Sequence, residues 1–177
     1  VLIGDNVKAE ADGAATTYLI TLKYHFVDVN GNFVANVLSD DRTLSVTKDS
    51  PQYDAVLPVQ IGYTPVLVST NFDCEINQID GEYILHLNFS NISSNIEITI
   101  NYTPNHNITY TVYHHVQNPD DDRYTIHSTE VFHDGIVGEP VPEGLQYSKD
   151  ELDGYDYLYY IREMVTPDGQ TSIHIYY

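Results

Sequence analysis

Polar and apolar residues alternate with a period of two along much of the chain. In residues 18–26, Ile20, Leu22 and Tyr24 fall on one side of the chain, whereas Thr21 and Lys23 fall on the other. The same alternation recurs in residues 83–89, 96–102, 155–161 and 173–177. Because a period of two is the pattern of a half-buried β-strand, we predict a strand in each of these segments.

Turn signals separate the predicted strands, at Asn30-Gly31, Asp80-Gly81, Pro119-Asp120 and Pro167-Asp168-Gly169. Helical periodicity is scarce. The only two candidate helices are short, at Asp49–Leu57 and Glu143–Leu152. We therefore predict a β-rich α+β fold.

Similar short motifs occur twice, in the same order. The pairs are Ile20-Thr21 with Ile108-Thr109, Gly62-Tyr63 with Gly154-Tyr155, and Ile98–Tyr102 with Ile173–Tyr177. The offset is 88 residues for the first pair, 92 for the second and 75 for the third. Two related modules explain this series, provided that the first has an extra hairpin around residues 71–83.

The repeats define the predicted domains. We expect a first module over residues 18–103 and a second over residues 108–177. Residues 104–107 form a linker because Pro104 cannot continue a hydrogen-bonded ladder. Residues 1–17 are small and polar, and form either a linker or an edge strand. Each module would run strand, turn, strand, crossover with at most one short helix, and two closing strands, an order compatible with a β-grasp (ubiquitin-like) mixed sheet.

The charge of the chain excludes one class of partner. Seven basic residues against 26 acidic ones give a formal charge of -19. Nucleic-acid binding requires clustered lysines and arginines, so we expect no nucleic-acid partner. No apolar run approaches the ~20 residues of a membrane-spanning helix, and we expect no membrane insertion. The chain stops inside an apolar alternation, which suggests a piece of a longer protein.

The repeated motifs resemble those of a known family. The first copy reads Ile20-Thr21-Leu22-Lys23-Tyr24, Val27-Asp28-Val29-Asn30-Gly31, Gly62-Tyr63 and Ile98-Thr99-Ile100-Asn101-Tyr102. This is similar to the mucin-binding-protein (MucBP) module of Gram-positive surface adhesins. The second copy, with its opening YTVYHHVQNPD and later Gly135-Ile136-Val137-Gly138-Glu139, resembles related listerial and lactobacillar repeats. The tandem of residues 18–177 resembles one Mub-type repeat.

The resemblance implies a function as well as a β-grasp fold. Such a chain would be extracellular and anchored to the cell wall, in a row with neighbouring repeats of the same chain. It would bind host mucin glycans or other glycoproteins, and immunoglobulins are a further partner of some such repeats. The alternative is a structural stalk or spacer module of a surface protein, with no ligand of its own.

Aromatic residues near the end of the chain supply the candidate binding site. We expect the odd-numbered tyrosines of residues 155–161 to face the core, which leaves Tyr160 and Asp156 on the outer side. Tyr176 and His174 take the outer side of the last strand. If these strands are neighbours, Tyr160 and Tyr176 form an exposed pair, flanked by Asp156 and His174, on which a sugar ring can stack. The alternative is that these tyrosines are purely structural.

Two segments are candidate calcium sites, although we expect no cofactor to be required. Asp28, Asn30 and Asn32 place oxygen ligands at alternate positions, as in the front of a calcium loop. A type I′ hairpin turn explains the same residues, since Asn-Gly supplies positive φ angles. The second candidate is the cluster Asp120, Asp121 and Asp122, for which a solvated loop is the alternative.

The histidines and serines do not indicate an enzyme. His114 and His115 are adjacent, so they point to opposite faces of a strand and cannot bind one ion together. No serine lies in a Gly-x-Ser-x-Gly turn, and no nucleophile, base and orienting group are arranged as a triad requires. We therefore expect a binding or structural protein without catalytic residues.

Overall fold

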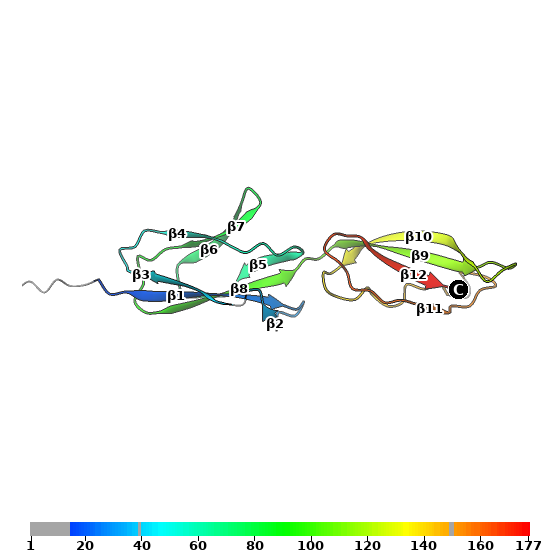
Figure 1. The fold of residues 1–177 in the computed structure, drawn as a ribbon, viewed down its shortest axis with the longest axis horizontal. Helices are drawn as coiled ribbons and strands as arrows, with labels where there is room; N and C mark the ends of the chain where they lie inside the picture. The colour runs from blue at the N-terminus through cyan, green and yellow to red at the C-terminus, as the bar shows by residue number, and fades with distance from the viewer. Residues whose placement is uncertain (1–14, 39, 149–150) are drawn as a thin grey trace, which may run out of the picture.

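The fold consists of strands. The computed structural model describes residues 15–38, 40–148 and 151–177, and these residues form twelve strands and no helix. Strands β1 to β8 lie towards one end of an elongated molecule, and β9 to β12 lie towards the other (Figure 1). We call residues 18–104 the first half and residues 108–177 the second half. The prediction of a β-rich fold is confirmed.

A five-stranded sheet forms one layer of the first half. Its order is β2 (Phe33–Asn36), β1 (Tyr18–Val27), β8 (Ile96–Pro104) and β5 (Tyr63–Leu67), and β3 (Arg42–Val46) also pairs with β1. The central strands β1 and β8 are parallel, whereas β2, β3 and β5 are antiparallel to their neighbours. The first and last strands of this half therefore lie side by side.

A three-stranded sheet forms the second layer of the first half. Its order is β4 (Tyr53–Val56), β7 (Glu82–Leu87) and β6 (Cys74–Ile79). The hairpin of β6 and β7 turns at Asp80-Gly81 and is the extra hairpin predicted for this copy. Leu85 and Leu87 of β7 pack with Ile20, Leu22 and Ile98 of the five-stranded sheet, so alternate residues of the two layers fill one core.

One sheet forms the second half. Its order is β10 (Tyr124–Gly135), β9 (Ile108–Gln117), β12 (Thr171–Tyr176) and β11 (Tyr159–Tyr160), with β9 and β12 parallel. Val141 and Leu152, from the long connection between β10 and β11, pack with Ile173 and Ile175 of β12 in a second core. We call the opposite side of this sheet the outer face.

Both predicted helices are wrong. Residues 49–57 contain a turn and strand β4. Pro51 interrupts any helix there, and the buried residues Ala55 and Leu57 are two positions apart, as on one face of a strand. The described residues of 143–152 form turns and irregular chain. There, Gly144 has a φ of +86°, a value outside the helical region. No described helix could cross a membrane.

Strand pairing refines the internal repeat. In the first half Leu22 lies opposite Ile98, and in the second half Val112 lies opposite Ile173. If β8 and β12 are equivalent with the offset of 75 residues, β1 and β9 are equivalent with an offset of 90, two more than the sequence motifs suggested. Residues 15–17 are not in a strand, and the rest of the predicted N-terminal linker or edge strand lies outside the described residues.

His114 anchors β9 in the second core. Its side chain has 0% exposure, stacks on Tyr147 at 4.1 Å between ring centroids, and has Nδ1 3.0 Å from the Tyr177 hydroxyl. The Tyr177 oxygen also accepts the backbone N–H of Tyr147 at 2.6 Å. We therefore assign the Tyr177 proton to the bond with Nδ1, which places the imidazole proton on Nε2, 3.6 Å from a Glu130 carboxylate oxygen.

The two halves meet at a close backbone contact. The Asn105 N–H donates to the Gly62 carbonyl at 2.8 Å, and the Val137 N–H donates to the Asn105 carbonyl at 3.0 Å. A Cβ at Gly62 would lie 2.5 Å from Cβ of Pro167 and 3.0 Å from a Val137 methyl group. Gly62 also has a φ of +84°, so both its conformation and its surroundings favour glycine. We call these contacts the junction.

We expect the stability of the second half to fall in mild acid because of His114. Burial lowers the pKa of His114 below its ordinary value, and the Glu130 carboxylate opposes this shift. The unfolded chain then binds this proton at a higher pH than the folded chain does. The free energy of unfolding therefore decreases as the pH falls from about 6.5 towards the folded-state pKa.

Urea unfolding of the wild type and of His114→Phe between pH 7.5 and 5.5 measures this effect. The phenyl ring keeps the stacking on Tyr147 but carries no proton, so the variant should show a shallower pH dependence. It should also be less stable at pH 7.5 by about 1–2 kcal/mol, because the hydrogen bond to Tyr177 is lost. Equal slopes in the two proteins would contradict the role of His114.

Alanine substitutions at two comparable glycines test whether the junction is packed. Gly62 and Gly154 have φ angles of +84° and +88°, but a Cβ at Gly154 has no atom within 4 Å. Alanine at either position adds the left-handed penalty of about 1–2 kcal/mol. Gly62→Ala also forces Pro167 and Val137 to move, so it should cost at least ~1 kcal/mol more than Gly154→Ala in denaturant unfolding. Equal losses would mean that the junction is not packed in solution.

Candidate functional site

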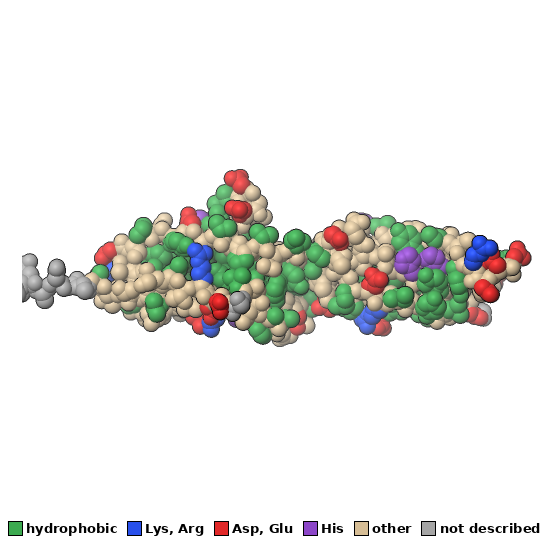
Figure 2. Space-filling view, in the orientation of Figure 1, with side chains coloured by type: hydrophobic (Ala, Val, Ile, Leu, Met, Phe, Trp, Pro, Cys, Tyr) green, Lys and Arg blue, Asp and Glu red, His purple; other side chains and the backbone are tan. Residues whose placement is uncertain are grey.

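Six rings line the outer face of the second half. They come from all four strands of its sheet: Tyr113 and His115 from β9, Tyr124 from β10, Tyr159 from β11, and His174 and Tyr176 from β12. We call this set the aromatic ladder. All six are partly or well exposed. The face shown in Figure 2 has histidine side chains among apolar ones on the second half.

The rings of the aromatic ladder contact one another in a continuous row. Tyr113 stacks on His174 at 5.0 Å, and His174 lies 5.1 Å from His115. His115 stacks on Tyr176 at 4.8 Å, and Tyr176 stacks on Tyr159 at 4.9 Å with 19° between the planes. Tyr124 meets Tyr176 edge-on at 5.1 Å. Because the inner rings stack on one another, the row offers their edges with hydroxyl and imidazole groups, together with the half-exposed ring of Tyr159 at one end. This surface suits a flat apolar ligand with polar edges.

The centre of the aromatic ladder is a hydrogen-bonded histidine pair. His115 Nε2 lies 2.8 Å from His174 Nδ1, a contact that needs one donor and one acceptor nitrogen. Burial lowers the pKa of His115, and the neighbouring His174 and His114 lower it further. The neutral form of His115 is therefore favoured at neutral pH, so this imidazole offers a polar group to a ligand without adding positive charge.

Strand alternation explains why these rings share a face. On β12, Ile173 and Ile175 point into the core, so His174 and Tyr176 point outward. On β9, buried His114 directs its neighbour His115 outward in the same way. The pairing of His174 with Tyr113, Tyr176 with His115 and Tyr159 with Tyr176 then brings the rings into register.

The first half has the same central strands but different outward side chains. By register, the positions equivalent to the aromatic ladder on β1, β8 and β5 hold Lys23, His25, Thr99, Asn101 and Val66. The outer side of that sheet instead has an ion pair between Lys23 and Glu97 at 2.7 Å. The aromatic ladder is therefore a property of the second half and is not required by the shared strand arrangement.

The structure brings together only part of the predicted binding site. Tyr176 and His174 lie in the aromatic ladder, on the outer face as predicted. The expected orientation of Tyr160 is wrong: it pairs with Ile175 and packs against the second core, whereas Tyr159 is 50% exposed and stacks on Tyr176. Asp156 does not flank this pair but lines a cleft at the end of the second half.

Irregular chain before Tyr159 explains why the wrong residues of 155–161 were expected to face the core. Only Tyr159 and Tyr160 form a strand, and the chain before them is irregular, so alternation cannot be extended back to Tyr155. Residues on both faces are aromatic, which removes the polar positions that normally set the phase. Tyr113 and Tyr124 were also missed, because only the pairing of β9, β10 and β12 brings them to Tyr176 and His174.

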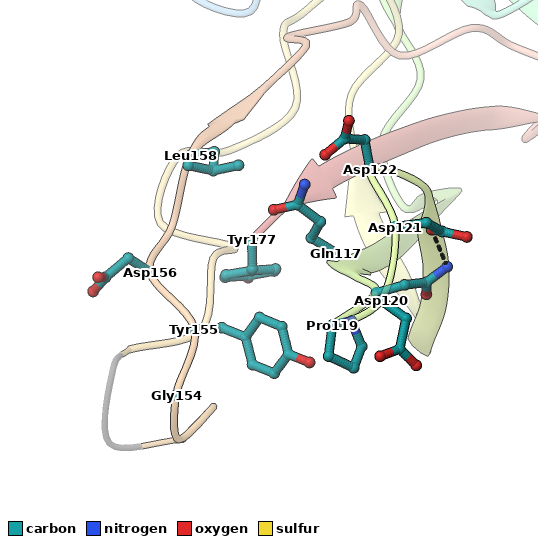
Figure 3. A pocket seen from close by; sticks show the side chains of 11 residues that line it. Gln117, Pro119, Asp120, Asp121, Asp122, Gly154, Tyr155, Asp156, Leu158 and Tyr177 are labelled. Atoms are coloured by element: carbon teal, nitrogen blue, oxygen red, sulfur yellow. Dashed lines mark hydrogen bonds between the residues drawn. The ribbon is translucent and has the colours of Figure 1, made fainter.

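The cleft at the end of the second half has a volume of about 640 Å³. Figure 3 shows the ring of Tyr155 facing the turn that contains Pro119 and Asp120, with Asp156 on the Tyr155 side. Asp121 accepts hydrogen bonds from the Asn118 side chain at 3.0 Å and from the Arg123 backbone at 2.9 Å. These bonds lower the pKa of Asp121, which also forms an ion pair with the Arg123 side chain at 3.0 Å. With four aspartates, the lining of the cleft is rich in carboxylates.

The two calcium candidates have different local structures. In the first, Asp28 Oδ1 accepts the backbone N–H groups of Asn30 and Asn32 at 2.9 and 2.8 Å, which lowers the Asp28 pKa and closes the turn between β1 and β2. Gly31 has a positive φ and Asn30 does not, so this is not a type I′ turn. In the second candidate, Asp121 is held by the turn bonds described above.

Among the described residues, no three His, Cys, Asp or Glu side chains are arranged to hold a metal ion. Calcium at Asp28, Asn30 and Asn32, or at Asp120, Asp121 and Asp122, stays a prediction from the sequence. Asn and backbone oxygens are also calcium ligands, so a direct measurement is the appropriate test.

Known proteins give no independent assignment of this site. The sequence matches no protein-family model and no curated protein.

Proposed function

We propose that this chain is a non-enzymatic adhesin module that binds host mucin glycans or glycoproteins through the aromatic ladder of its second half. The aromatic ladder is the observation that carries the proposal. Its exposed rings offer stacking surface to the apolar face of a sugar, and its histidine and tyrosine edges offer hydrogen-bond partners to the hydroxyl groups. The first half has the same central strands without such a row of rings, so the strand arrangement alone does not require the aromatic ladder.

The proposed fold is a tandem of two β-grasp modules, over residues 18–103 and 108–177 with a linker at 104–107. In each half, the parallel central pair of first and last strands supports this assignment. The separate buried cores of the two halves support the division. A helix is missing from the described residues of both halves, so each module would be a β-only variant of the β-grasp.

The proposed setting is the surface of a Gram-positive bacterium, where the chain would be displayed outside the cell and anchored to the wall. One aromatic ladder on an open sheet gives a shallow site and weak binding. Repetition of the module beside neighbouring repeats raises the overall avidity without any new contact. Immunoglobulins are a second class of glycoprotein partner that this proposal includes.

The alternative function is a stalk or spacer. The end-to-end order of the two halves in Figure 1 favours it, because such an arrangement extends the reach of a surface protein. The close junction at Gly62 would limit bending between the halves. Under this alternative, the aromatic ladder has no ligand.

Binding of the chain to immobilised purified mucin tests the proposal. Tyr159→Ala combined with Tyr176→Ala removes two stacked rings from the outer face, and we expect the apparent affinity to fall about tenfold or more. Circular dichroism should show an unchanged fold, because both side chains point away from the second core.

Phe33→Ala is the matched control for this measurement. Phe33 is an exposed aromatic residue of the first half, outside the aromatic ladder, so its loss should leave mucin binding unchanged. Equal binding by the wild type and the double tyrosine variant would reject the aromatic ladder as the site. A wild type that binds no mucin, immunoglobulin or glycan on an array would favour the spacer function.

Melting of the chain in EDTA and then in millimolar calcium tests the two calcium candidates. If calcium binds only the folded chain, the melting temperature should rise with calcium concentration, since binding stabilises the folded state by mass action. Asp28→Asn and Asp122→Asn would then show which site is responsible. An unchanged midpoint in the wild type would remove calcium from the account.

A further inference from the structure

The junction shows how one half is seated on another. Two turns of the second half contact the end of the first half: Ile136–Glu139, which carries Val137, and Thr166–Gly169, which carries Pro167. Together they pack over Gly62, where the chain has a φ of +84° and enters β5 at Tyr63. The structure thus records one complete end-to-end contact between two related units.

The opposite end of the first half carries one turn equivalent to a turn of the junction, and a second turn at a comparable place before its last strand. Strand β3 is followed by a turn in which the Ser50 N–H donates to the Thr47 carbonyl at 3.0 Å, just as Glu139 donates to Ile136 at 3.0 Å after β10. A second turn, closed by Ile92 N–H to Phe89 carbonyl at 3.0 Å, precedes β8 as the turn Thr166–Gly169 precedes β12.

This equivalence puts Lys48 where the second half has Val137. Both residues are second in their turns, directly after the residue whose carbonyl accepts the turn hydrogen bond. Val137 is 5% exposed because it is buried at the junction, whereas Lys48 is exposed. In the part of the chain that the structure describes, this turn is therefore exposed at Lys48 and at the adjacent Asp49.

The opposite end of the second half carries an uncovered counterpart of Gly62. Gly154 has a φ of +88°, precedes Tyr155 as Gly62 precedes Tyr63, and leaves a Cβ position free of any atom within 4 Å. It lines the 640 Å³ cleft described above, together with Tyr155, Asp156 and the turn of Asp120, Asp121 and Asp122 (Figure 3). Two turns cover Gly62, whereas no described atom would lie within 4 Å of a Cβ at Gly154.

Charge distinguishes the two uncovered surfaces from the covered one. The covered contact is formed by Val137, Pro167 and Gly62, with no charged side chain among them. The two other surfaces differ in charge. The turn has Lys48 beside Asp49, whereas the cleft has four aspartates, of which Asp121 is ion-paired with Arg123 at 3.0 Å. In a chain with only seven basic residues against 26 acidic ones, Lys48 is the side chain of this turn whose charge complements the acidic cleft.

We propose that copies of this chain dock head to tail, with the turn Thr47–Ser50 of one copy seated on Gly154 of another and Lys48 in the acidic cleft. The occupant of the cleft is thus a second copy of the chain, seated through the turn that is equivalent to Ile136–Glu139 of the internal junction. Such a contact joins two different surfaces and leaves one of each free, so it continues into an open row of copies. This inference does not depend on glycan binding.

Concentration-dependent NMR of the ¹⁵N-labelled full chain tests the docking. At a salt concentration of about 0.1 M the general repulsion between acidic copies is screened beyond ~10 Å. Between ~0.05 and ~1 mM chain, a range that detects weak association, we expect amide shifts at both ends together: around Lys48, and around Gly154 and Asp120–Asp122. The aromatic ladder should not shift.

Charge reversal makes the test specific. Lys48→Glu should weaken association at least about tenfold, because it places a carboxylate in an acidic cleft. Asp120→Lys combined with Asp122→Lys should do the same by opposing Lys48. A mixture of these two proteins should recover the shifts, since the carboxylate introduced at position 48 of one variant then meets the basic cleft of the other. Lys23→Glu, the same change of charge on the middle of β1, is the matched control and should associate as the wild type does.

Three results would overturn the proposal. One is a wild-type spectrum that does not change up to ~1 mM. Another is a shift at the cleft without a shift at Lys48, which would mean that a different surface occupies the cleft. The third is equal association by Lys48→Glu and Lys23→Glu, because charge at the turn would then play no part. Since mucin is absent throughout, none of these results bears on the proposed glycan binding.

Discussion

The parallel pairing of the first and last strands organises both halves of this protein. In the first half β1 lies beside β8, and in the second half β9 lies beside β12. Each pair has a buried side built from alternate residues, so the register of that side fixes which side chains project from the other. In the second half, burial of His114 and Ile175 therefore determines that His115 and Tyr176 point outward together. The proposed binding surface depends on this pairing.

The aromatic ladder and the junction are two uses of the same strand arrangement. Side chains on the outer side of each sheet do not contribute to its core, so these positions can differ between the two halves. The second half has rings at positions where the first half has Lys23 and Thr99. At the ends of the sheet, turns and a left-handed glycine make a surface that receives the next unit. The proposed glycan binding by the outer face and the proposed docking by the ends would therefore use different residues.

Much of the fold could be predicted from the sequence, because alternation and turn residues are local signals. The strands around residues 18–26, 83–89, 96–102 and 173–177, and the extra hairpin, follow from them. The helix at 49–57 was wrong because Pro51 interrupts the segment. The helix at 143–152 was wrong because tertiary contacts outweigh local preference there, for example the hydrogen bond from the Tyr147 N–H to the Tyr177 hydroxyl. The site was predicted in part: Tyr176 and His174 follow from clean alternation, whereas Tyr159 was exchanged for Tyr160 because an irregular segment shifts the phase. Tyr113 and Tyr124 depend on strand pairing, which a single sequence does not specify.

The most direct test of the central claim is to map a mucin-type oligosaccharide onto the chain by NMR. We expect changes in the ring signals of His115, His174 and Tyr176 on the outer face, with the signals of the equivalent side of the first half unchanged. The imidazole signals are well suited to this measurement because the two histidines share a 2.8 Å contact at the centre of the aromatic ladder. Changes confined to the first half or to the cleft at Gly154, with none in the aromatic ladder, would contradict this expectation.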